Sequence, residues 1–225
     1  MARQAEAENQ AGVVELRRDE RGLALVGDGM ELRGDFSRML PRLRRDRLGR
    51  ELLVKAARVR GVDGPTAVDC TAGLGEDSLL LAAAGFRVTL FERDKTIFAL
   101  LCDALERASA DPRLAGIVCR MELVGGDSIE GLASLGFAPD VVYLDPMFPG
   151  RTKSAAVKKK FQLLHHLEQP CEEGEALVEA ALAAHPRKVV IKRPPKGPEL
   201  AGVKPSYTVS GKAVRYDVLV PPPIA

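Results

Sequence analysis

The sequence has few of the residues that build metal sites, disulfide frameworks or membrane spans. Its 225 residues include no Trp and only three His, and the four cysteines form no CxxC pair: Cys70, Cys102, Cys119 and Cys171. This spacing favours reduced, mostly buried thiols over a zinc site or a disulfide framework. No apolar run approaches the roughly 20 residues of a membrane span, and the first ten residues lack a secretory pattern. We therefore expect a cytoplasmic protein that binds no metal and no membrane.

The composition is that of a soluble globular protein, with 46% hydrophobic and 28% charged residues. The formal net charge is only +2, but the charges are unevenly distributed, because residues 38–61 carry nine Lys or Arg and two acids. Clustered cations are typical of surfaces that meet nucleic-acid phosphates. A solvated helix face is the alternative interpretation of the same segment.

From residue 65 onward, short apolar strands alternate with turns and with segments of helical periodicity. The expected strands are TAVDC, FRVTLFE, MELVGGD, PDVVYLDP and RKVVIKRP. This alternation predicts an α/β fold with a mostly parallel sheet. The tail SYTVSGKAVRYDVLVP has no intervening helix and predicts an antiparallel hairpin at the sheet edge. Residues 12–33 predict a separate small antiparallel hairpin or meander.

Acidic residues stand at the ends of four of the expected strands. Ligands of open α/β sheets bind at the carboxyl ends of the strands, so we expect these side chains to share one rim. Two glycines allow a tight turn after the first of these strands, although Ser78 leaves the GxGxxG pattern incomplete. Glu92 ends the next strand, where a carboxylate can accept both hydroxyls of a ribose. The rim residues are Asp69, Gly73, Gly75, Glu92, Asp127 and Asp145.

The tetrapeptide Asp145, Pro146, Met147 and Phe148 follows the fourth of these strands. It is similar to the motif of amino-group methyltransferases, in which a carboxylate and a proline-fixed carbonyl accept the hydrogens of an exocyclic amine. We expect Asp145 and Pro146 to orient such an amine and Phe148 to stack on its base, as the catalytic set. A strand-terminating turn is the alternative.

On the motifs VDCTAGLGEDSLLLAAAG, LFERD, VVYLDPMFP, KSAAVKKK and VVIKRP, in this order, the chain resembles the bacterial 16S ribosomal RNA guanine-N2 methyltransferase family called RsmJ. The resemblance covers residues 62–220 and implies a Rossmann-like class I methyltransferase fold. It also implies methyl transfer from S-adenosylmethionine to a guanine amine in 16S ribosomal RNA of the small subunit. We expect a methyltransferase domain over residues 61–225 and an RNA-contacting extension, hairpin plus basic helix, over residues 1–60.

The resemblance also implies contacts for individual residues. Glu76 departs from the more usual basic residue of the family, which leaves a backbone contact possible there. The implied cofactor contacts are Glu76, Asp77, Glu92, Arg93, Asp127, Ser128 and Asp145, beside the turn residues Asp69, Gly73 and Gly75. From their charge and position near the rim, we expect the RNA backbone to contact Lys153, Lys158, Lys159, Lys192 and Arg193.

Three other functions remain as alternatives. An amino-methyltransferase could act on adenine N6 or on a protein glutamine with the same constellation. A ribosome assembly factor could retain the fold without catalysis, although the intact carboxylates and glycines argue against this. A nicotinamide dehydrogenase is disfavoured by the incomplete glycine pattern and by the Asp-Pro motif.

Overall fold

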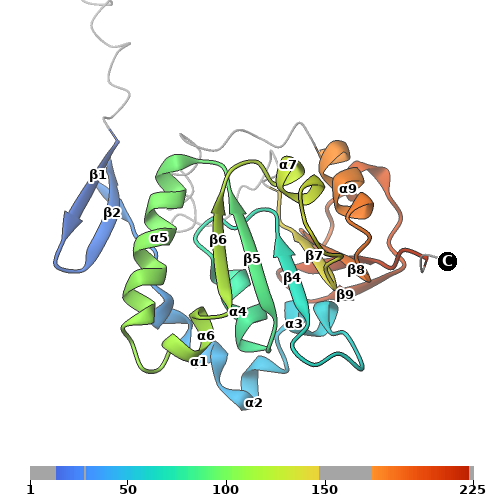
Figure 1. The fold of residues 1–225 in the computed structure, drawn as a ribbon, viewed down its shortest axis with the longest axis horizontal. Helices are drawn as coiled ribbons and strands as arrows, with labels where there is room; N and C mark the ends of the chain where they lie inside the picture. The colour runs from blue at the N-terminus through green and yellow to red at the C-terminus, as the bar shows by residue number, and fades with distance from the viewer. Residues whose placement is uncertain (1–13, 28, 147–173, 223–225) are drawn as a thin grey trace, which may run out of the picture.

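A seven-stranded sheet forms the centre of the protein, which we analyse as a computed structural model describing residues 14–27, 29–146 and 174–222. The strand order is β6-β5-β4-β7-β8-β10-β9 (Figure 1). The predicted α/β fold with a mostly parallel sheet and a C-terminal antiparallel hairpin is confirmed. The parallel strands are β4 (Thr66–Asp69), β5 (Arg87–Glu92), β6 (Met121–Gly125), β7 (Val141–Leu144) and β8 (Lys188–Arg193), and β10 (Arg215–Leu219) runs antiparallel to β8 and to β9 (Tyr207–Ser210).

Helices cover both faces of the sheet. All four residues of β7 are buried, as expected for a strand covered on two sides. One hydrophobic cluster joins Tyr143 to α3 (Leu52–Ala57), α4 (Glu76–Ala83) and α5 (Lys95–Ser109). A second cluster, on the other face, joins Val142 to α7 (Ser128–Ala133) and α9 (Gly174–Ala183). Neighbouring strand residues therefore belong to different cores.

Strand β4 lies at the point where the chain reverses its direction across the sheet. It pairs with β5 on one side and with β7 on the other, both in parallel. The connections that leave β4 and β7 consequently diverge at their carboxyl ends. Such a switch point is where open α/β sheets bind ligands, so the fold locates the site before any side chain is considered.

Helix α5 is predicted well by the sequence, whereas two shorter helices are not. The Asp94 carboxylate caps α5 by accepting the backbone N–H groups of Thr96 at 2.8 Å and Ile97 at 2.9 Å. Its apolar residues recur at helical spacing and are buried. In contrast, α6 (Ala115–Val118) and α7 have four and six residues, too few to show a period.

The N-terminal strands form a three-stranded antiparallel meander, as predicted. It contains β1 (Glu15–Asp19), β2 (Gly22–Gly27) and β3 (Met30–Leu32), and β2 packs against α5. The Asp103 carboxylate on α5 is 3% exposed and accepts from Arg18 at 2.9 Å and from Arg107 at 2.8 Å. The exposed Arg18 side chain and the buried Asp103 carboxylate thus fasten the meander to the central domain.

The basic segment is a series of short helices rather than the single basic helix expected. A 3-10 turn (Phe36–Met39) leads into α1 (Leu40–Leu43), α2 (Arg45–Leu48) and α3. Arg44 and Glu51 adopt extended ψ angles of 139° and 130°, which interrupt the helix. Phe36 and Leu53 lie in the same hydrophobic cluster as α4. The domain boundary at residue 60 stays a prediction.

Candidate active site at the carboxyl ends of β4, β5, β6 and β7

A glycine turn follows β4 and opens α4. Gly73 and Gly75 have positive φ angles of +53° and +74°. A Cβ on Gly75 would lie 2.8 Å from Cδ1 of Leu101 and 3.1 Å from the Phe36 ring, so packing as well as conformation requires glycine there. The predicted tight turn is present.

Asp69 supports this turn from inside the protein. Its carboxylate accepts the backbone N–H of Thr71 at 3.0 Å and the Ser78 hydroxyl at 2.5 Å. The residue is 1% exposed, and burial raises the pKa of Asp69 to about 7, against the opposing effect of these hydrogen bonds. The Asp69 carboxylate therefore supports the turn and the start of α4, and its predicted contact with a cofactor stays a prediction.

Glu92 lies against the glycine turn, as the position at the end of β5 led us to expect. One carboxylate oxygen accepts the N–H of Gly73 at 3.0 Å and the other accepts the N–H of Asp94 at 2.8 Å. Burial raises the pKa of Glu92, partly offset by these backbone donors. A carboxylate has about four acceptor sites, more than these backbone groups occupy, so Glu92 can still accept from a hydroxyl group of a ligand.

The connection after β6 brings a third acid to the same edge. Asp127 caps α7 by accepting the N–H of Ile129 at 2.8 Å, and Ser128 is the first residue of that helix. The second oxygen of Asp127 lies 3.6 Å from the guanidinium of Arg93, which directly follows β5. Arg93 and Asp127 thus join the ends of two adjacent strands.

Asp145 lies beside the glycine turn rather than in the hydrophobic interior. Its backbone N–H donates to the Thr71 hydroxyl at 2.7 Å. The Asp145 side chain is 26% exposed, and Pro146 after it is buried. The acid at the end of β7 and the turn after β4 are therefore neighbours in space, although more than 70 residues separate them in the sequence.

Lys192 joins this acid to α4 in a network that the sequence did not predict. Its ammonium nitrogen lies 2.6 Å from Oδ2 of Asp77 and 2.8 Å from Oδ2 of Asp145, and the Tyr143 hydroxyl donates to Asp77 at 2.6 Å. Burial alone would lower the pKa of Lys192, but the two carboxylates outweigh burial and raise it. Burial likewise opposes ionisation of Asp77, yet Lys192 lowers its pKa. Side chains alternate between the two faces of a strand, so the sequence of β8 indicates that Lys192 and Val190 point to the same face. This is the face that α4 covers, where Asp77 lies.

The two residues at the end of β8, which we predicted to contact RNA, are held by contacts within the protein. Arg193 is 1% exposed and its Nε donates to the Pro198 carbonyl at 2.8 Å, so little of its side chain is accessible, and its predicted RNA contact stays a prediction. Lys192 is directed to two carboxylates and its side chain is 20% exposed. The remaining predicted contacts lie outside the described residues: Phe148, Lys153, Lys158 and Lys159.

Other features were tested only within the part of the chain that the structure describes. There, Cys70 is buried but Cys102 and Cys119 are exposed, contrary to the expectation of mostly buried thiols. No group of three or more His, Cys, Asp or Glu in these residues could hold a metal ion. No helix formed by them is long and apolar enough to cross a membrane.

The hydrogen-bond donors and acceptors around the turn fit S-adenosylmethionine. The Glu92 carboxylate, 3.0 Å from the N–H of Gly73, can accept ribose hydroxyls next to the glycine turn. The backbone N–H groups in the first turn of α4, at Glu76 and Asp77, suit a carboxylate. The Asp77 side chain is already held by Lys192 and Tyr143, so only its backbone is available for that contact.

Comparisons with known proteins agree with this geometry. A family described as "Putative SAM-dependent methyltransferase" matches residues 4–221. A ribosomal RNA small subunit methyltransferase J of Thioalkalivibrio sulfidiphilus is 46% identical over 76% of this chain and 68% of its own length. The protein of that name from Pseudomonas aeruginosa is 48% identical, over 75% and 65%. The chain thus spans about two thirds of the length of these relatives.

Solved structures support the same assignment. A SAM-dependent methyltransferase of Neisseria gonorrhoeae is 32% identical, with a TM-score of 0.76 over 96% of this chain and 86% of that one. An rRNA methyltransferase of Streptomyces viridochromogenes has a TM-score of 0.51 at 20% identity, over 77% and 84%, which shows a shared fold. This chain belongs to the ribosomal RNA small subunit methyltransferase J family of S-adenosylmethionine-dependent methyltransferases.

Proposed function

We propose that this protein transfers a methyl group from S-adenosylmethionine to the exocyclic N2 amine of a guanine in 16S ribosomal RNA of the small subunit. The observation that carries the proposal is the hydrogen bond between the Asp145 N–H and the Thr71 hydroxyl. It sets the predicted amine-binding acid beside the glycine turn, while Glu92 contacts the other side of that turn. We infer the RNA substrate from the names of the relatives, and the amino group as the methyl acceptor from the Asp-Pro-Met-Phe motif at residues 145–148.

On the donor side, S-adenosylmethionine, when bound, supplies an electrophilic methyl group on its sulfonium sulfur. Glu92 would accept the ribose hydroxyls of the cofactor, and the N-terminal N–H groups of α4 at Glu76 and Asp77 would bind its carboxylate. Asp127 and Ser128 at the start of α7, together with Arg93, would contact the adenine end of the cofactor. We assign these parts of the cofactor to residues that follow the neighbouring strands β4, β5 and β6 at the same edge of the sheet.

On the acceptor side, the chemistry is limited by a poor nucleophile. The lone pair of a guanine N2 amine is delocalised into the ring, so holding the nitrogen in line with the methyl carbon is the main contribution of the protein. Asp145 accepts one amine hydrogen, and the carbonyl preceding Pro146 accepts the other. The N–C bond forms as the S–C bond breaks, and the nitrogen then loses one proton to solvent.

Lys192 is the positioning residue for this step. Its contact of 2.8 Å with Oδ2 fixes the orientation of the Asp145 carboxylate, and Asp77 in turn fixes Lys192 at 2.6 Å. Preorganised charges of this kind cost no rearrangement during the reaction. In this proposal Lys192 orients the Asp145 carboxylate, which accepts a hydrogen bond from the guanine amine, instead of contacting an RNA phosphate as expected from the sequence.

The proposal is tested with small ribosomal subunits that lack the modification. Wild-type protein and S-adenosylmethionine are expected to methylate one guanine, located by mass mapping of RNA fragments. Asp145→Ala is expected to lower kcat by about 10²-fold or more, because amine orientation is lost, with RNA binding retained. Methylation of an adenine, or turnover unchanged in Asp145→Ala, would contradict the assignment. The absence of S-adenosylmethionine binding in calorimetry would contradict its first step.

A further inference from the structure

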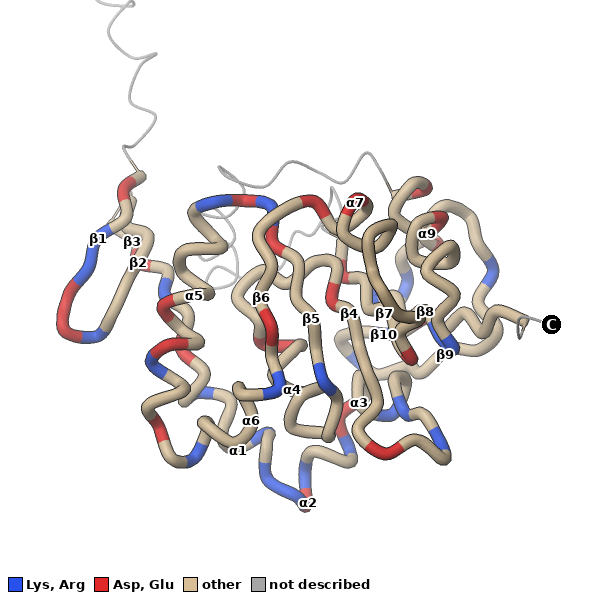
Figure 2. Tube along the Cα trace, viewed as in Figure 1, with Lys and Arg blue, Asp and Glu red and all other residues tan. Residues whose placement is uncertain are grey.

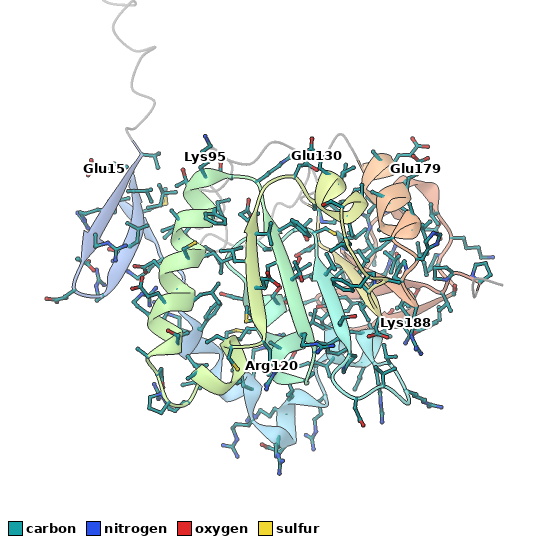
Figure 3. All side chains as sticks on the ribbon, viewed as in Figure 1. Glu15, Lys95, Arg120, Glu130, Glu179 and Lys188 are labelled. Carbon is teal, nitrogen blue, oxygen red and sulfur yellow. The ribbon has the colours of Figure 1, made fainter. Side chains whose placement is uncertain are left out.

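A basic groove lies at the opposite end of the sheet from the candidate active site. It has a volume of about 760 Å³ and is lined by three segments: the end of α3 with the residues after it, the start of β8, and the C-terminal strands. Figure 3 labels Lys188 at this lower edge, and labels Lys95, Glu130 and Glu179 at the opposite edge. The four residue steps from Lys188 to Lys192 correspond to roughly 13 Å of strand.

The lining of the groove is strongly positive. It contains five Lys or Arg, one His and no acid: Lys55, Arg58, Val59, Arg60, His185, Pro186, Arg187, Lys188, Tyr207, Val220, Pro221 and Pro222. Arg187 pairs with Asp140 at 3.0 Å, outside the lining. Lys55, Arg58 and Arg60 are exposed and make no ion pair within the described residues. Their charge is therefore not neutralised by neighbouring carboxylates there.

Lys188 builds the groove rather than serving as a free cation. Its ammonium donates to the Arg58 carbonyl at 2.7 Å and to the Tyr207 hydroxyl at 2.9 Å, which fastens the end of α3 to the first residue of β8. The same ammonium lies 5.6 Å from the centroid of the Tyr207 ring. Tyr207 is nevertheless 40% exposed, so an aromatic surface stands beside the three uncompensated cations.

The groove continues into the basic segment described above. Figure 2 shows Lys and Arg along α2, α3 and the lower ends of the strands, on the edge away from the glycine turn. Exposed cations beside an exposed ring match the chemistry of an RNA strand, whose phosphates bind cations and whose bases stack on aromatic rings. An acidic protein surface would supply charge but would leave the ring without a base to stack on.

We propose that this basic groove is a second RNA-binding site, which binds phosphates of the substrate RNA away from the reacting guanine. The inference rests on the proposed function for the identity of the RNA. The RNA substrate then contacts the protein at both ends of the parallel strands. The guanine reacts at one end, and phosphates bind in the basic groove at the other and strengthen binding. Cations that bind only phosphates act on the strength of binding and not on the methyl-transfer step.

The test is a triple variant in which Lys55, Arg58 and Arg60 are each replaced by Gln. Exposed side chains tolerate such changes, and a thermal unfolding curve verifies folding. A matched control removes the same charge elsewhere, with Arg113, Lys196 and Lys212 each replaced by Gln, because these exposed residues lie outside the groove and outside residues 1–60. Binding of unmodified small subunits and of 16S RNA transcripts is measured at several salt concentrations, and kcat and KM are measured in parallel.

The groove variant is expected to bind RNA about tenfold more weakly near 0.1 M salt, with KM raised similarly and kcat unchanged. The slope of log affinity against log salt should become shallower by about 2, at roughly 0.7 per single-stranded phosphate contact. The control should resemble the wild type. Equal losses in both triple variants, or an unchanged salt slope in the groove variant, would overturn the proposal.

Two further outcomes separate this inference from the proposed function. If RNA binding depends on the groove but no guanine is methylated, the proposed reaction is contradicted and the proposal that the groove binds RNA is supported. If the groove variant loses kcat while RNA affinity is unchanged, the groove is not a binding site. Loss of an acidic protein partner in the groove variant, with unchanged RNA affinity, would likewise overturn the assignment to RNA.

Discussion

The ammonium nitrogen of Lys192 lies 2.8 Å from Oδ2 of Asp145, the acid at the end of β7. Asp77 holds the same ammonium from α4 at 2.6 Å, and Tyr143 donates to that carboxylate. Two acids that would repel each other are thereby kept in fixed positions by one shared cation. The first prediction follows from this arrangement.

Lys192→Gln is expected to lower kcat by about 10²-fold while the Kd for RNA stays within about twofold, because in the proposed mechanism Lys192 orients Asp145 instead of binding phosphates. The measurement is steady-state kinetics on small subunits together with RNA binding. Lys196→Gln removes an exposed cation nearby and should leave both constants unchanged. If the variant lost RNA affinity but kept its kcat, Lys192 would instead contact the phosphates of the RNA.

Glu92 makes cofactor affinity dependent on pH. Burial raises the pKa of Glu92, and only its ionised form accepts two ribose hydroxyls without also donating a proton. The affinity for S-adenosylhomocysteine should therefore fall, by at most about tenfold per pH unit, as pH is lowered through that pKa. Glu92→Gln should bind more weakly at pH 8 and lose this dependence. Calorimetry from pH 5 to 8 measures both, and parallel pH curves would contradict the prediction.

Asp69 makes stability dependent on pH in the opposite direction to a salt-bridged acid. Its pKa is about 7 in the folded protein and 3.8 ordinarily, so between these values the folded state holds more protons than the unfolded state. The free energy of unfolding should fall as pH rises from about 4 to 7, by up to about 4 kcal/mol. Asp69→Asn should remove this slope. Urea unfolding at pH 5 and pH 8 tests it, since a difference between variant and wild type that is constant with pH would contradict it.

Gly75→Ala should destabilise the protein by about 1–3 kcal/mol more than Gly64→Ala. Both glycines have similar positive φ angles, +74° and +61°, so both substitutions introduce backbone strain. Only the Cβ at position 75 meets neighbours, Leu101 and Phe36, whereas nothing lies within 4 Å at position 64. Chemical denaturation of the two variants isolates the packing contribution. Equal losses would show that the turn adjusts to admit the methyl group.

The strands and the rim could be predicted because apolar runs, glycine turns and strand-end acids are local signals. The rule that ligands of open α/β sheets bind at the carboxyl ends of the strands predicted that Asp145 lies near the glycine turn. These local signals did not predict where the side chains of Asp69, Lys192 and Arg193 point. Each depends on which face of the sheet a residue occupies, and a one-residue difference reverses that face. The run of cations in residues 38–61 likewise concealed the breaks at Arg44 and Glu51 that divide it into short helices.

The Thr71 hydroxyl that receives the Asp145 N–H also has a mechanical consequence. Thr71 belongs to the turn that would hold the methyl donor, and Asp145 to the loop that would hold the acceptor. Coupled through one oxygen atom, the two loops shift together, so the spacing between donor and acceptor is preserved when the rim moves. We expect RNA entry to be accommodated by segments outside this pair.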